Sequence, residues 1–98
     1  MTPTPGAAIR LSGHLDVPLD RIEAVMAALP AHIRLTRAEP GCLRFDVTPH
    51  PAMPGRLVVR ELFASRAAFE AHRERIRASH WERVTSGIPR FYDVEEGA

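Results

Sequence analysis

The stretch CLRFDVTPHPAMPGRLVVRELF, residues 42–63, holds two strand patterns joined by a proline-rich connection. Residues 42–48 alternate between apolar and polar side chains, which is typical of a strand with one buried face, here formed by Leu43, Phe45 and Val47. Residues 56–63 carry apolar side chains on both faces, which a strand buried on one side does not need. We therefore expect both faces of the sheet to be covered.

The residues before this stretch predict a strand and a helix. Residues 8–16 alternate in the same way, and residues 19–33 place apolar side chains at helical spacing. Pro30 lies inside the helical pattern, so we expect a kink or a fresh start there. A type II turn at residues 39–41, in which Pro40 precedes Gly41, would end the helix.

The residues after it predict a helix, a short second helix and a last strand at 90–94. Ser65 is a suitable N-cap for the first helix, and Ser79 has capping-box spacing to Glu82 in the second. The order βαββαβ is that of an α+β, ferredoxin-like split βαβ fold, an antiparallel sheet with helices on one face. Because Val59 and Phe63 are expected on the open face, a second copy of the chain would cover it and give a homodimer.

The composition is that of one small globular domain, which we place at residues 8–98 after a disordered arm at 1–7. The chain has 98 residues, of which 45% are hydrophobic and 26% charged. A net charge of +1 gives no field that would attract nucleic acid or a membrane surface. No apolar run reaches the roughly 20 residues of a membrane-spanning helix, and a signal-peptide pattern is missing, so we expect a cytoplasmic protein.

Four segments together resemble the antibiotic biosynthesis monooxygenase (ABM) domain family, in its quinol monooxygenase-like branch. They are TRAEPGCLRFDV at 36–47, RLVVRELF at 56–63, FEAH at 69–72 and SHW at 79–81. The resemblance implies a homodimer whose sheets close into a dimeric α+β barrel, with a cavity between each sheet and its helices. It also implies a cofactor-independent monooxygenase that oxidises a small aromatic or quinol-like substrate with molecular oxygen.

Glu61 and His72 are the candidate catalytic residues. Glu61 shares a strand face with Val59 and Phe63, where a carboxylate needs a partner or its pKa rises. His72 follows Phe69 by one helical turn, so both lean towards the sheet, and an imidazole there could take a proton from a phenol near pH 7. The resemblance places both at functional positions of the family, with Glu61 orienting His72 or relaying the proton. A purely structural role remains the alternative for each.

A second group of side chains is expected to bind substrate: Ser12, His14, Phe63, His80 and Trp81. Ser12 and His14 lie on the polar face of the first strand and would touch a ligand if that face lines the cavity. Phe63 and Trp81 would form walls, and His80 precedes Trp81 in the short helix. His32 is expected to cap the kinked helix.

No metal or cofactor is expected. The single cysteine, Cys42, and the absence of a histidine pair at ligand spacing argue against a zinc site. The positions that serve haem in haem-degrading relatives of the family fall near Ser12, Phe63 and Thr85, none of which is an axial ligand. Two alternatives to the monooxygenase stay open: a small-molecule isomerase that uses the same His/Glu pocket, and a non-catalytic dimeric ligand-binding protein.

Overall fold

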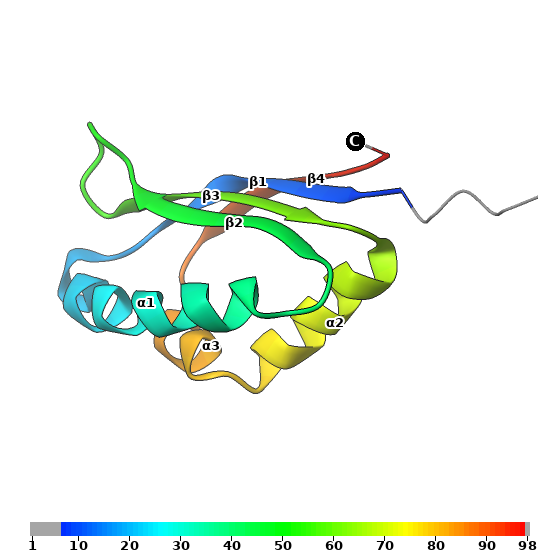
Figure 1. Ribbon diagram of the computed structural model, residues 1–98. Helices are drawn as coiled ribbons and strands as arrows, with labels where there is room; N and C mark the ends of the chain where they lie inside the picture. The colour runs from blue at the N-terminus through cyan, green and yellow to red at the C-terminus, as the bar shows by residue number, and fades with distance from the viewer. Residues whose placement is uncertain (1–6, 98) are drawn as a thin grey trace, which may run out of the picture.

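The computed structural model describes residues 7–97 and arranges them as a four-stranded antiparallel sheet with the helices on one face (Figure 1). The sheet has the strand order β2-β3-β1-β4, which confirms the ferredoxin-like fold. The predicted arm at 1–7 lies outside the described residues, apart from Ala7. In chain order the elements are β1 (Ile9–Asp16), the 3-10 turn η1 (Leu19–Arg21), α1 (Ile22–Arg37), β2 (Cys42–Pro49), β3 (Arg56–Phe63), α2 (Arg66–Arg77), α3 (His80–Thr85) and β4 (Arg90–Glu96).

The predicted serine N-caps of α2 and α3 and the predicted turn after α1 are confirmed. The Ser65 hydroxyl accepts a hydrogen bond from the backbone N–H of Ala68 at 3.1 Å, and the Ser79 hydroxyl accepts one from Glu82 at 3.1 Å. After α1, the backbone N–H of Cys42 donates to the carbonyl oxygen of Glu39 at 3.2 Å, and Gly41 has φ +84°, as the predicted turn requires.

Of the two outcomes expected at Pro30, a kink or a fresh start, the fresh start does not occur, because α1 continues through Pro30 as one helix. Pro30 lies on the exposed side of α1. Val25 and Leu29 before it and Thr36 after it are all buried on the inner side. This packing holds both halves of the helix against the core and offsets the hydrogen bond that proline removes.

The residues of β3 that were expected on the open face of the sheet lie on the face that packs against the helices. Val59 and Phe63, expected on the open face, are 2% and 0% exposed and point towards the helices. The open face carries Val58, Arg60 and Leu62 instead. Successive side chains of a strand point to opposite faces, so once Leu57 and Glu61 face the helices, Val59 and Phe63 must do so too.

The strand β2 departs from the predicted alternation at its first residues. Phe45 and Val47 are buried as expected, but Leu43 is 61% exposed. The pairing of β2 with β3 has an irregularity between Cys42 and Arg44. An extra residue in one strand of a pair shifts the alternation, and this moves Leu43 out of the core.

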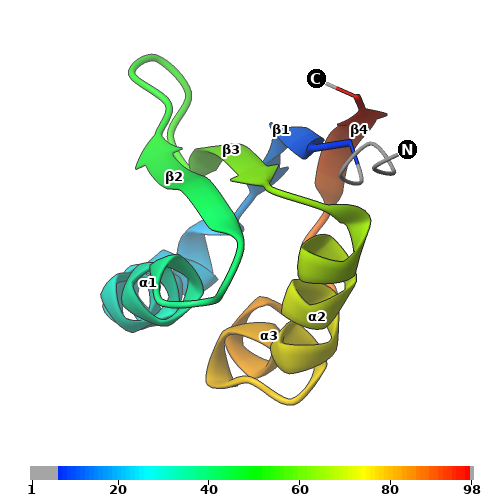
Figure 2. The same ribbon diagram turned by 45° about the vertical axis from the view of Figure 1, so that its right-hand side comes forward.

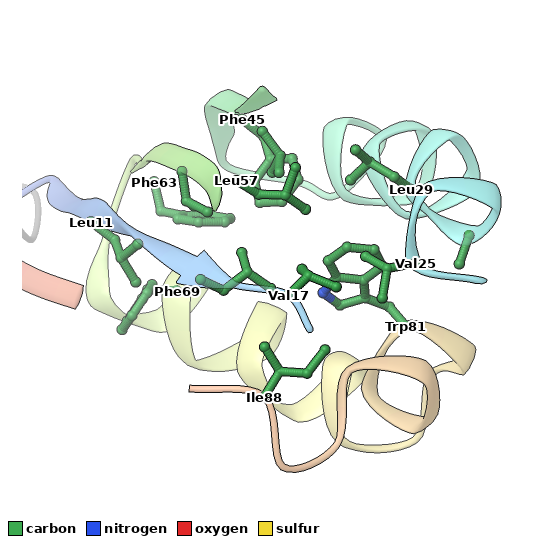
Figure 3. Close-up of a cluster of buried hydrophobic side chains, with 14 of the residues drawn as sticks. Leu11, Val17, Val25, Leu29, Phe45, Leu57, Phe63, Phe69, Trp81 and Ile88 are labelled. Carbon is green, nitrogen blue, oxygen red and sulfur yellow. The ribbon is translucent and has the colours of Figure 1, made fainter. Parts of the chain in front are cut away.

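The core is continuous between the sheet and the three helices. Figure 3 shows the Trp81 indole reaching from α3 towards Val25 and Leu29 of α1. In the inner strand β1, next to the edge strand β4, Gly13 has φ +154°, and a Cβ atom there would lie 2.0 Å from the carbonyl oxygen of Phe91 in β4. Glycine therefore permits the close approach of β4, which brings Tyr92 to the inner face.

Candidate active site

A pocket of about 450 Å³ lies between the inner face of the sheet and the helices. Its volume is within the range of small-molecule sites, and its walls are mainly apolar, as such sites usually are. All four strands and all three helices contribute to it. The polar and charged side chains that line it are His32, Glu61, His72, Arg73, Arg77, Glu82, Arg90 and Tyr92.

His72 is held by a carboxylate that the sequence did not identify. Its Nδ1 lies 2.9 Å and 3.1 Å from the two carboxylate oxygens of Glu39. The Arg75 guanidinium also donates to Glu39, and it donates to the Thr36 hydroxyl at 2.9 Å. His72 is 6% exposed, and this network fixes its ring at the pocket wall.

The same network sets the protonation of His72. A carboxylate on Nδ1 favours the tautomer that carries its proton there, so Nδ1–H donates to Glu39 and Nε2 keeps a free lone pair. Burial lowers the pKa of His72 below its ordinary value, and the hydrogen bond to Glu39 opposes that shift. The imidazole is therefore neutral near pH 7 and available as a base.

Glu61 lies next to the free nitrogen of His72 but is not bonded to it. Its Oε1 is 3.8 Å from Nε2 of His72, beyond hydrogen-bond distance. Within residues 7–97, this oxygen is buried and has no hydrogen-bond partner. Burial, followed by repulsion from Glu39, raises the pKa of Glu61 from 4.5 to about 7. At neutral pH this carboxyl can therefore give or accept a proton in the pocket.

His32 belongs to the site and does not cap the helix. It is 6% exposed and stacks on the Trp81 indole, with ring centroids 4.4 Å apart and planes 3° apart. The Phe45 ring meets it edge-on at 5.2 Å. Burial is the main reason that the pKa of His32 falls from 6.5 to about 3, with smaller contributions from His72, Arg75 and Arg90.

We predict that His32 makes the protein sensitive to acid. The folded chain keeps this imidazole neutral, whereas the unfolded chain protonates it near pH 6.5. Its contribution to stability is fully present above pH 6.5 and is lost as the pH falls below that value towards the folded pKa. At pH 5 the loss should reach about 2 kcal/mol, taking 1.4 kcal/mol for each pH unit.

Urea unfolding of the wild type and of His32→Phe at pH 7.5 and pH 5 measures this effect. The variant removes the titrating group and keeps a flat ring on Trp81, so it should lose about 2 kcal/mol less stability between the two pH values. An equal acid loss in both proteins would contradict the prediction.

The structure brings three of the predicted site residues to one pocket. Glu61, His72 and Trp81 line it. Phe63 is fully buried behind it and packs against the His72 ring at 4.8 Å. His80 is exposed at the start of α3 and does not line the pocket.

Ser12 and His14 lie on the other face of the sheet. They alternate with the inward-facing residues Leu11 and Leu15, so the strand geometry directs them away from the pocket. The His14 ring packs against Phe91 at 5.1 Å on this open face. They were expected to touch substrate only if their face of the strand lines the cavity. In the single chain that face does not line it.

Among the polar residues of the site that sequence reasoning missed, His32 and Glu39 were missed for different reasons. His32 follows Val25 and Leu29 at helical spacing, so the periodicity of α1 could have placed it on the buried face. Glu39 stands in a turn before Pro40 and Gly41, and nothing local indicates that it meets α2.

Between residues 7 and 97, no group of three or more His, Cys, Asp or Glu side chains could hold a metal ion. In the same part of the chain, none of the helices combines the length and the apolar composition that crossing a bilayer demands.

Comparison with known proteins gives a family and a fold. The family model described as "Antibiotic biosynthesis monooxygenase" matches residues 8–83. No curated protein matches the chain in sequence.

Among solved structures, a protein from Nitrosomonas europaea, provisionally named an antibiotic biosynthesis monooxygenase, superposes with a TM-score of 0.81 at 24% identity, over 97% of this chain and 94% of its own. The protein Rv0793 from Mycobacterium tuberculosis has a TM-score of 0.75 at 26% identity, over 94% of this chain and 96% of its own. A conserved protein from Methanosarcina mazei has a TM-score of 0.75 at 18% identity, over 94% of each chain. At such identities the first and third likenesses concern the fold alone.

Proposed function

Because the chain belongs to the antibiotic biosynthesis monooxygenase family, we propose that it oxidises a small aromatic, quinol-like substrate with molecular oxygen and without a cofactor. One observation supports this most: His72 has a carboxylate on Nδ1 and a free Nε2 beside Glu61, at the wall of an apolar pocket. This is the arrangement of a general base with an orienting carboxylate.

In the proposed reaction the substrate hydroxyl donates its hydrogen bond to Nε2 of His72. Transfer of that proton gives a phenolate, which is a much better electron donor than the phenol, and an imidazolium. The Glu39 carboxylate stabilises the imidazolium through Nδ1, as an orienting carboxylate does in other histidine bases. Glu39 is thus proposed as the positioning residue, a role that sequence analysis gave to Glu61.

Glu61 is proposed to act on the substrate directly. With its pKa near 7 it can donate a hydrogen bond to an oxygen that gains negative charge and can return a proton to the reduced oxygen. For a simple hydroquinone the balance is one quinol plus O₂ giving one hydroxyquinone plus water. The substrate supplies all the electrons, so the protein has to provide only a dry pocket, a base and a hydrogen-bond donor.

Oxygen uptake with a panel of hydroquinones tests the proposal. We expect consumption above the rate in protein-free buffer for at least one bicyclic hydroquinone, and one labelled atom from ¹⁸O₂ in the organic product. No uptake with any phenol would contradict the proposal. Proton–deuterium exchange into candidate ketones would then identify an isomerase, and binding without exchange a ligand-binding protein.

We also propose that the chain forms a homodimer through the open face of the sheet. The single chain leaves Val58, Leu62 and Phe91 on that face, with Phe91 55% exposed. The same face also carries charged side chains, among them the cross-strand partners Arg60 and Asp46. A small domain gains stability by burying such a face against a second copy.

The proposed dimer can be tested by measuring the molar mass of the protein in solution. Light scattering at micromolar concentration should give twice the mass of the 10.9 kDa chain. Val58→Asp should shift the protein towards the monomer or unfold it, because the interface would bury an unpaired charge. Ala24→Asp, on the exposed side of α1, is the matched control and should stay dimeric. A folded wild-type monomer would overturn the proposal.

A further inference from the structure

We infer that His32 holds a second oxygen atom of the substrate, at a different wall of the pocket from Glu61 and His72, and thereby selects aromatic compounds with oxygen atoms on two edges. The inference rests on the proposed function, because it concerns the substrate of the same pocket. It assigns a binding role to a residue that the reaction described above does not use.

First, two residues that line the pocket each carry a buried polar atom without a hydrogen-bond partner among residues 7–97. In the part of the chain that the structure describes, two buried side-chain polar atoms lack a hydrogen-bond partner, Nδ1 of His32 and Oε1 of Glu61. Both residues line the same pocket. Buried polar atoms are normally paired, so these two atoms, on residues that line one pocket, need partners that the described residues do not supply.

The second support is the placement of His32. It belongs to α1 and His72 belongs to α2, and these helices lie on opposite sides of the space beneath the sheet (Figure 2). The Phe45 ring lies close to both imidazoles, with centroids 5.2 Å from His32 and 5.9 Å from His72. A flat ligand against Phe45 can therefore reach both imidazoles with different edges.

The third support is the way His32 is fixed. Its orientation comes from stacking on Trp81 and from the edge of Phe45, and no hydrogen bond from residues 7–97 occupies Nδ1. A neutral imidazole has one donor and one acceptor nitrogen. In one tautomer Nδ1 of His32 can accept a hydrogen bond from the hydroxyl of a reduced substrate. In the other tautomer it can donate one to the carbonyl of an oxidised product. His32 therefore suits a ligand whose oxygen changes between these two states.

Anaerobic calorimetry with 1,4-dihydroxynaphthalene and 1-naphthol tests the inference without turnover. The wild type should bind the diol about tenfold more tightly, the effect of one hydrogen bond to a buried group. His32→Phe should abolish this preference while it binds 1-naphthol within a factor of about three of wild type, and His32→Gln, which keeps a donor and an acceptor, should retain part of it. His50→Asn, in the loop after β2 and outside this pocket, should keep the full preference.

A second ligand keeps the test independent of how the variants fold. In wild type, 4-methoxy-1-naphthol should bind no better than 1-naphthol if His32 accepts from the second hydroxyl. Equal wild-type affinity for the diol and 1-naphthol, or a full preference retained in a folded His32→Phe, would overturn the inference. Failure of oxygen uptake alone would overturn only the proposed reaction, since these affinities are measured without oxygen.

Discussion

Replacing His72 with asparagine should lower the rate of oxygen uptake by about 10²- to 10⁴-fold, the usual contribution of a general base. The amide N–H of asparagine can occupy the place of Nδ1–H and still donate to Glu39, whereas nothing replaces the lone pair of Nε2. The variant therefore removes the base and keeps its hydrogen bond to the carboxylate. The measurement is initial oxygen uptake with the best hydroquinone of the panel.

Stability is the control for this variant. Asparagine keeps the bond to Glu39 but is smaller than the buried imidazole, so the replacement should cost about 1–3 kcal/mol, more than at an exposed position. Urea unfolding and the affinity for 1-naphthol show whether the pocket survives. Retention of more than a tenth of the wild-type rate by a folded variant would return His72 to a structural role.

Replacing Glu61 with glutamine should make the protein more stable at pH 8 by up to about 3 kcal/mol, at 1.4 kcal/mol for each unit of pKa shift. Burial raises the pKa of Glu61 from 4.5 to about 7, so the folded state disfavours the carboxylate. The contribution of this group to stability is fully present below pH 4.5 and is lost as the pH rises through 7. Glutamine has the shape of the protonated acid and does not titrate.

The difference between the two proteins should therefore be small at pH 5 and reach its full size at pH 8. Urea unfolding of both proteins at each pH measures it, and the titrations of His32 and His72 cancel because both proteins contain them. Glu70→Gln, on the exposed side of α2, is the matched control and should not change the pH dependence. A Glu61→Gln protein that is less stable than wild type at pH 8 would mean that the carboxylate has a partner.

The same substitution should lower activity while it raises stability at pH 8. Glutamine can still donate a hydrogen bond to the substrate, but it cannot exchange a proton with reduced oxygen. A gain in stability together with a loss in oxygen uptake is expected if the buried Glu61 carboxylate destabilises the fold and is retained for the reaction. Unchanged uptake would leave Glu61 as a binding group only.

The sequence by itself determined the order of the elements and most of their ends. The alternation over residues 8–16 and 42–48 and the capping positions Ser65 and Ser79 are local signals, and each acts within a few residues of the chain. For the same reason the sequence placed His72 on an inward-facing position, whereas it grouped Glu61 with Val59 and Phe63, which were expected on the open face. It could not assign the inner and outer faces of β3, because both sets of alternating residues contain apolar side chains.

The tertiary structure alone decided which polar groups meet. Glu39 and His72 are 33 positions apart, and they touch only because the turn after α1 lies against α2. His32 meets Trp81 because α3 packs on α1. Such contacts depend on how whole elements cross, which is set by the summed packing of the core and not by any local pattern. The same packing leaves Nδ1 of His32 and Oε1 of Glu61 without partners in one pocket.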